Sequence, residues 1–170
     1  MPSDIETLIT EIWTGIANQV GTVEQIEPHA VVGVADSLED QGVSIVCLSS
    51  IPEEHYNAVL DSAAKQTGAD FVVVIHEAFL RVTKTKEPPM KFVGKWPNIE
   101  KVIDTEGMEA IDSVVVSYTM KGGAVTLETK KILRREGGTR YIDDSSHDKT
   151  STVENRFLDG IFLPDRANLH

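Results

Sequence analysis

DFVVVIHEAFLRV, residues 70–82, is the most apolar stretch of the chain and the one that decides its fold. Side chains of a strand alternate between its two faces, and here both faces are apolar. One face carries Phe71, Val73, Ile75 and Phe79, and the other carries Val72, Val74, Ala78 and Leu80. This pattern predicts a central strand covered on both sides, or a strand that runs from the sheet into an oligomer interface.

Two amphipathic helices are expected before this strand. Apolar residues recur at spacings of three and four between Ile5 and Val20, which predicts a helix over residues 4–19 that ends at Gly21. A second helix begins near Pro52, a residue suited to a first helical turn, and stops at Gly68. Between the helices, residues 29–35 and 43–48 are rich in β-branched side chains and predict a hairpin.

The second half of the chain predicts further strands and two irregular segments. Residues 112–120 and 124–134 predict a second hairpin, and residues 139–142 a short strand. Residues 83–110, broken by prolines and glycines, predict a long loop in which residues 98–103 could form one helical turn. The polar residues 143–154 predict a mobile loop. We therefore expect a single α+β domain over residues 1–170, a mostly antiparallel sheet with two helices packed on one face, in the order α-β-β-α-β-(long loop)-β-β-β.

The composition is that of an acidic globular protein. The 170 residues carry a formal net charge of −11, which opposes binding to nucleic acid over the whole surface and to anionic membranes. No apolar stretch approaches the roughly 20 residues that a transmembrane helix needs. The single cysteine, Cys47, allows no internal disulfide and is expected to be a small core residue. These features predict a soluble, cytoplasmic protein.

The charge is uneven along the chain. Between residues 81 and 101, six basic residues face two acidic ones, so this segment carries +4 and the rest of the chain −15. Its candidate binding residues are Lys84, Lys86, Lys91, Phe92, Lys95 and Trp96. Because lysines attract phosphates and rings stack on bases, weak binding of single-stranded nucleic acid is one interpretation. Charge complementarity favours a different one, docking on an acidic protein partner or on the acidic body of this chain, within or between copies.

The neighbours His76 and Glu77 are the strongest candidates for chemistry. Alternation places Glu77 on the face of Ile75 and His76 on the opposite face, so the two side chains cannot easily share one metal ion. A buried carboxylate without a partner costs several kcal/mol or takes up a proton. Glu77 is therefore a general base or a metal ligand, or else it emerges at the sheet edge or pairs with Arg81, Lys84 or a basic residue across the strands.

The enzyme interpretation is a hydrolase that uses Glu77, with His76 and His55 as further candidate catalytic residues. Folding would have to bring His55 or Asp104 close to Glu77. The sequence contains none of the motifs of phosphate loops, nucleophile elbows, zinc proteases or dinucleotide-binding turns, and its histidines lack a ligand spacing. We therefore expect no metal and no other cofactor, and a protein without enzymatic activity is favoured.

Part of the chain resembles a group of uncharacterised bacterial and phage-borne proteins. The resemblance is carried by Glu77-Ala78-Phe79 at the end of a strand, a proline-containing interruption, the strand residues 113–116 (Ser-Val-Val-Val) and the Gly122-Gly123 hairpin. It spans residues 50–135. It implies a shared fold, and because the group has no assigned activity it supplies no functional residues.

The function that these observations favour is non-enzymatic. We expect a protein that acts by self-association, as a homo-oligomer, or by contact with another macromolecule. Its contact elements would be the segment 83–110 and the apolar patch 157–163. The hydrolase and the weak binding of single-stranded nucleic acid remain the alternatives.

Overall fold

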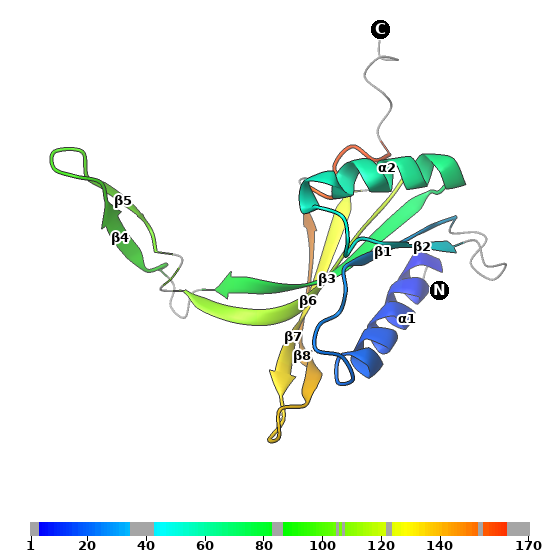
Figure 1. The fold of residues 1–170 in the computed structure, drawn as a ribbon, viewed down its shortest axis with the longest axis horizontal. Coiled ribbons are helices and arrows are strands. Elements are labelled where there is room, and N and C mark those ends of the chain that lie inside the picture. The colour runs from blue at the N-terminus through cyan, green and yellow to red at the C-terminus, as the bar shows by residue number, and fades with distance from the viewer. Residues whose placement is uncertain are drawn as a thin grey trace, which may run out of the picture.

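The structure, a computed structural model, describes residues 4–34, 43–82, 87–104, 106, 108–121, 124–152 and 155–162. Helices and strands follow one another along these segments (Figure 1). Their bounds are α1 Asp4–Gln19, β1 His29–Gly33, β2 Val43–Cys47, the 3-10 helix η2 Glu53–His55, α2 Tyr56–Thr67, β3 Phe71–Val82, β4 Met90–Val93, β5 Glu100–Ile103, β6 Glu109–Met120, β7 Val125–Arg134 and β8 Arg140–Thr152. The predicted helices and the order of the predicted strands are confirmed.

The described strands form one large sheet and one small hairpin. The sheet has the order β2-β1-β3-β6-β7-β8, and each neighbouring pair is antiparallel. β3 and β6 are its long central pair, matched residue for residue from Phe71 opposite Met120 to Val82 opposite Glu109. β4 pairs with β5 outside this sheet. The predicted α+β class with an antiparallel sheet is confirmed, while the predicted Gly122-Gly123 turn lies outside the described residues.

One face of the sheet packs on α1. The apolar stripe of α1 forms a cluster with the odd-numbered residues of β3 and the even-numbered residues of β6, namely Ile5, Ile9, Trp13 and Ile16 with Phe71, Val73, Ile75, Val114 and Val116. Each of these side chains is 6% exposed or less. Burying one large apolar side chain contributes about 1.5–3 kcal/mol, so this interface is a main source of stability.

The opposite face packs on α2. Tyr56, Leu60 and Ala64 of α2 form a second cluster with Val72 and Val74 of β3. The two helices therefore lie on opposite faces of the sheet (Figure 1), and the prediction that both pack on one face is wrong. A helical apolar stripe indicates that a helix packs on a sheet, but it does not indicate on which face. Because both faces of β3 are apolar, each needs a cover, and each receives one helix.

The two faces of β3 are buried only over the first half of the strand. Residues 71–75 are 2% exposed or less, His76 and Glu77 are half-buried, and Phe79 is 73% exposed. The prediction of a strand sandwiched over all of residues 70–82 is confirmed for the first half and wrong at Phe79. The reason is length, because β3 and β6 extend well beyond the two helices (Figure 1).

Beyond the far ends of β3 and β6, the β4–β5 hairpin projects away from both helices (Figure 1). We call residues 87–104 the arm. The segment expected to be a long loop thus contains a hairpin, and the helical turn considered for residues 98–103 is wrong, because Lys101 pairs with Phe92 in a strand ladder. The turn of the arm needs Gly94, which has a φ of 99° and whose place cannot hold a Cβ without collision with the Asn98 carbonyl oxygen.

Three further expectations are corrected by the structure. Residues 143–152 belong to β8 rather than to a mobile loop, and their polar side chains suit the edge of a sheet. Phe157, Leu158 and Ile161 are buried in the cluster with α2 and are not exposed contact elements. Cys47 is exposed rather than in the core, because β2 is the other edge strand.

Candidate functional site

Glu77 lies in a buried ion pair with Arg140, the first residue of β8. Arg140 Nη1 is 2.8 Å from Glu77 Oε1, and the two side chains are 5% and 9% exposed. The same carboxylate oxygen accepts a hydrogen bond from the backbone N–H of Ile26 at 2.9 Å, and Arg140 Nη2 donates to the Val23 carbonyl at 3.0 Å. The buried charge thus has a partner, and the pair ties the segment after α1 to two strands of the sheet.

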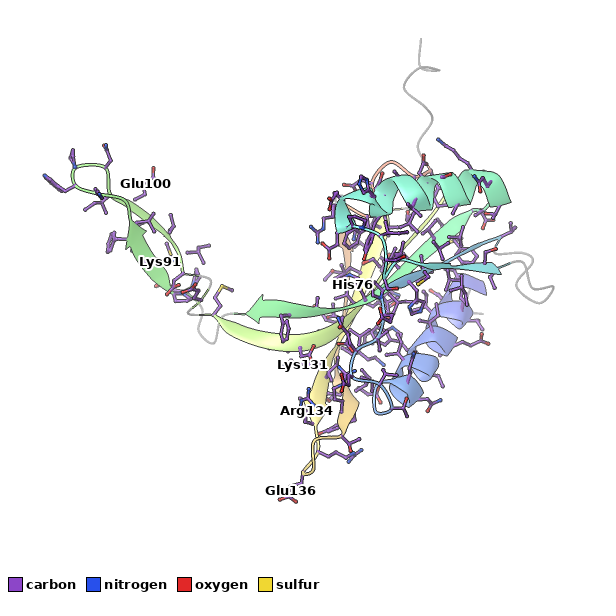
Figure 2. The ribbon with its side chains drawn as sticks, viewed as in Figure 1. His76, Lys91, Glu100, Lys131, Arg134 and Glu136 are labelled. Carbon is purple, nitrogen blue, oxygen red and sulfur yellow. The ribbon has the colours of Figure 1, made fainter. Side chains whose placement is uncertain are left out.

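A cavity of about 330 Å³ lies beside this ion pair. Four charged side chains from four strands meet in its wall, because Glu77, Asp112 and Arg134 continue the face of the sheet that α1 covers and Arg140 is paired opposite Arg134. Figure 2 shows Arg134 toward the end of the β7–β8 hairpin. The full lining is Glu24, Gln25, Glu77, Ala78, Phe79, Asp112, Arg134 and Arg140. The wall therefore combines proton-accepting and cationic groups in one corner of the fold.

Asp112, in the wall of this cavity, has a raised pKa. Loss of solvation on burial raises the pKa of Asp112, the Glu77 carboxylate raises this pKa further, and Arg140 and Arg134 lower it in part. The folded protein thus binds a proton at Asp112 more tightly than the unfolded chain does. This contribution to stability is fully present below the ordinary pKa of an aspartate and is lost as the pH rises through the raised value.

We expect the substitution Asp112→Asn, which imitates the protonated side chain, to raise the melting temperature at about pH 7 and to leave it nearly unchanged at about pH 3. Thermal unfolding followed by circular dichroism at the two pH values checks this. An equal change at both pH values, or a lower melting temperature at neutral pH, would contradict the assigned cause.

The structure separates the other candidate catalytic residues from Glu77. His76 points to the α2 face, with its ring edge-on to Phe157 at a centroid distance of 5.6 Å, and burial lowers the pKa of His76. His55 is exposed in η2, at the start of α2, and Asp104 lies in the arm, 3.8 Å from Lys91 Nζ. None of these three residues lines the cavity beside Glu77.

A second polar cluster surrounds Glu128 on β7. The local sequence pattern did not indicate it. Glu128 is 4% exposed, and its carboxylate accepts three hydrogen bonds. The donors are Trp13 Nε1 at 3.3 Å, Tyr118 Oη at 2.7 Å and His147 Nε2 at 2.6 Å. Burial and the hydrogen bond to Glu128 raise the pKa of the Tyr118 phenol. The cluster joins α1 to β6, β7 and β8.

His147 reaches Glu128 because β8 bulges. Opposite β7, the pairing jumps from Thr129–Asp148 to Lys131–Asp143, so one residue of β7 faces four of β8. Within the bulge the Asp143 carboxylate accepts hydrogen bonds from the backbone and hydroxyl of Ser145, and Ser146 Oγ accepts one from Lys131 N. A bulge re-aims side chains in this way. The Asp-Asp-Ser-Ser run is a sequence signal for this bulge, but a polar run of this kind equally predicts a loop.

The arm carries exposed apolar side chains on both strands and at its tip. These exposed side chains are Met90, Phe92, Val93, Trp96, Ile99 and Ile103, and Trp96 and Phe92 are the most exposed of them. Lys91 and Glu100, on β4 and β5, lie far from His76 in the large sheet (Figure 2). The arm therefore presents the predicted ring residues Phe92 and Trp96 to solvent.

The structure describes only two of the four basic residues that are expected to act with these rings. Lys91 approaches Asp104 within the arm, and Lys95 is exposed beside Trp96. Lys84 and Lys86 lie outside the described residues. The structure thus brings Lys91, Phe92, Lys95 and Trp96 onto one small hairpin, whereas Glu77, His76 and His55 lie in three separate surroundings.

Comparison with models of protein families, with curated proteins and with solved structures finds no match to this chain. In the described part of the chain, no three His, Cys, Asp or Glu side chains are arranged to hold a metal ion. No helix among the described residues is long and apolar enough to cross a membrane.

Proposed function

We propose that this protein acts by self-association, in which the arm of one copy docks on the body of another. The observation that carries the proposal is the row of large apolar side chains that the arm exposes, headed by Trp96 at 85% and Phe92 at 72%. An isolated two-stranded hairpin is marginally stable in water. A projecting hairpin that keeps such side chains exposed is typical of a segment that is buried by a partner.

Charge favours a second copy as that partner. The segment 81–101 carries +4, and the rest of the chain, at −15, is an acidic surface. Unlike charges attract the arm to another molecule of the same protein and steer its approach. The net charge of −11 opposes the alternative partner, a single-stranded nucleic acid, although Lys95 and Trp96 would suit one.

The hydrolase alternative receives less support from the geometry. Glu77 Oε1 already contacts Arg140 and the backbone of Ile26, so the candidate base is engaged in holding the fold together. The two histidines proposed as its helpers do not line its cavity. An acid–base pair would need a second group within hydrogen-bonding reach of the same substrate atom.

The test is the mass in solution of the wild type and of the double variant Phe92→Ser, Trp96→Ser. We expect the wild type to form a complex of several 18.7 kDa chains and the variant to be a monomer of unchanged fold, as measured by size-exclusion chromatography with light scattering and by circular dichroism. Ile45→Ser is the matched control, because Ile45 is 74% exposed on β2 of the body, and it should assemble as the wild type does.

Two results would overturn the proposal. One is a wild type that stays monomeric at high concentration, and the other is a variant that assembles as the wild type does. A single-stranded oligonucleotide added to the wild type distinguishes the alternative partner. Binding to the arm that weakens steeply with salt, in a chain that stays monomeric, would support nucleic-acid recognition instead.

A further inference from the structure

We propose that the tip of the arm, Lys95 and Trp96, enters a cavity between α1 and the β7–β8 pair of a second copy. This inference rests on the proposed self-association and identifies its docking site. The cavity measures about 570 Å³. Pockets of roughly 300–1,000 Å³ bury most of a drug-sized ligand, so this one has room for an indole ring.

The walls of this cavity suit an aromatic side chain. Trp13, Tyr118 and His147 place three rings in it, and Ile9 of α1 adds an aliphatic wall. The cavity beside Glu77, and a further cavity lined by residues 20–24 and by residues near the β7–β8 turn, both have Arg134 and Arg140 in their walls. The cavity beside α1 also contains two cations, Lys130 and Lys149, so its advantage for Trp96 lies in its three rings, compared with Phe79 alone in the wall beside Glu77.

Several polar groups of the cavity wall already have partners. Trp13 Nε1, Tyr118 Oη and His147 Nε2 all point their hydrogen bonds at Glu128. Lys130 Nζ lies 4.9 Å from the Trp13 ring centroid and 2.9 Å from Asp144 Oδ1. The indole ring of Trp96 can enter without breaking these contacts, and its N–H is the one polar group of the ring that loses water on burial.

In the cavity lining, three acidic side chains, Glu6, Glu11 and Glu128, outnumber two basic ones, Lys130 and Lys149, which favours a cationic tip. Glu6 and Glu11, on successive turns of α1, are exposed at the rim. Lys95 stands beside Trp96, and Lys101 follows on β5. When the indole ring lies inside, the ammonium group of Lys95 is left at the mouth, where it meets these carboxylates. Rim pairs of this kind direct the encounter and fix the register of two surfaces.

This contact joins two different surfaces, the tip of one copy and the α1 face of the next. Such a head-to-tail interface repeats from copy to copy and closes into a ring or continues as a filament. A copy with a damaged tip keeps its cavity, and a copy with a damaged cavity keeps its tip. In a mixture of the two variants, the intact tip of one can enter the intact cavity of the other. The remaining tip and cavity are both damaged, so the pair cannot grow further.

The experiment mixes Trp96→Ala with Thr10→Arg. Thr10 is exposed on α1 and lines the cavity, so the arginine fills it and adds a positive charge at its mouth. Thr14→Arg is the matched control, because Thr14 is exposed one turn further along α1 and does not line the cavity. Both threonine hydroxyls donate to the carbonyl four residues earlier, so the two substitutions remove the same local hydrogen bond.

We expect each of Trp96→Ala and Thr10→Arg to be a monomer of 18.7 kDa alone, and their equimolar mixture to give a dimer and nothing larger. Thr14→Arg should assemble as the wild type does. If Thr10→Arg also assembles while Trp96→Ala does not, the docking site is wrong although the arm is right. A mixture that stays monomeric also overturns the docking site, because the intact tip of Thr10→Arg should bind the intact cavity of Trp96→Ala. If Trp96→Ala itself assembles, the tip does not enter the cavity and this inference fails, whereas the proposed function fails only if Phe92→Ser, Trp96→Ser assembles as well.

Discussion

Arg140→Met is expected to lower the free energy of unfolding by about 3–5 kcal/mol, the usual loss when one partner of a buried ion pair is removed. The variant leaves the Glu77 carboxylate 9% exposed with no cation beside it, and it also removes the hydrogen bond to the Val23 carbonyl. In a chain of this size each kcal/mol corresponds to roughly 2–4 °C in melting temperature. Urea unfolding followed by circular dichroism gives the free energy directly.

Two further variants test the cause of this loss. Glu77→Gln combined with Arg140→Met removes both charges and keeps an oxygen for the Ile26 N–H, so the double variant should recover much of the stability. Arg134→Met is the control, because Arg134 is exposed in the wall of the same cavity and its loss should change stability by about 0.5 kcal/mol or less. If Arg134→Met and Arg140→Met have equal effects, the ion pair does not carry the stability assigned to it.

Glu128→Leu is expected to have the second largest effect, a loss of about 3 kcal/mol. It leaves the buried Trp13 N–H and Tyr118 hydroxyl without their acceptor, and each unpaired buried donor costs roughly 1–3 kcal/mol. Glu54→Leu, the same change at an exposed site in η2, should be nearly neutral. All of these measurements belong in the Phe92→Ser, Trp96→Ser background, which we expect to be monomeric, because association would add stability that grows with the logarithm of the protein concentration.

A spectroscopic readout accompanies this variant. The Glu128 carboxylate raises the pKa of Tyr118 by its hydrogen bond and its charge, in addition to the effect of burial. Without Glu128, Tyr118 should ionise at lower pH than in the wild type, and ultraviolet absorbance of the phenolate follows this titration. Tyr118→Phe identifies the signal among the three tyrosines. A titration curve unchanged by Glu128→Leu would show that burial alone sets the pKa of Tyr118.

Local patterns predicted the secondary structure because each depends on nearby residues. The stripe of α1, the β-branched runs of β1 and β2 and the two-faced β3 are all visible within a dozen residues. Even the orientation of Glu77 and His76 to opposite faces follows from alternation and is confirmed. The segment 83–110 was identified as unusual from its length and composition, although its hairpin was not foreseen.

Long-range partners could not be predicted from the same patterns. Arg140 lies far from Glu77 in sequence. The two side chains meet because the first residue of β8 contacts both Glu77 on β3 and the Val23 carbonyl in the segment that follows α1. Glu128 looks like a solvated residue of an alternating strand until Trp13 covers it. The assembled sheet determines which face each helix covers. It also determines whether a polar run forms a β-bulge within a strand or a loop between strands. The predicted resemblance to uncharacterised bacterial and phage-borne proteins stays a prediction.

The central claim is that the arm is buried by a second copy, and hydrogen–deuterium exchange at two protein concentrations tests it most directly. A hairpin exposed in the monomer exchanges fast, because its amides open readily. At a concentration where the protein associates, we expect the amides of β4 and β5 to become protected while those of β1, in the core of the body, stay unchanged. Exchange in the arm that is equally fast at both concentrations, in a sample shown to be associated, would contradict the account.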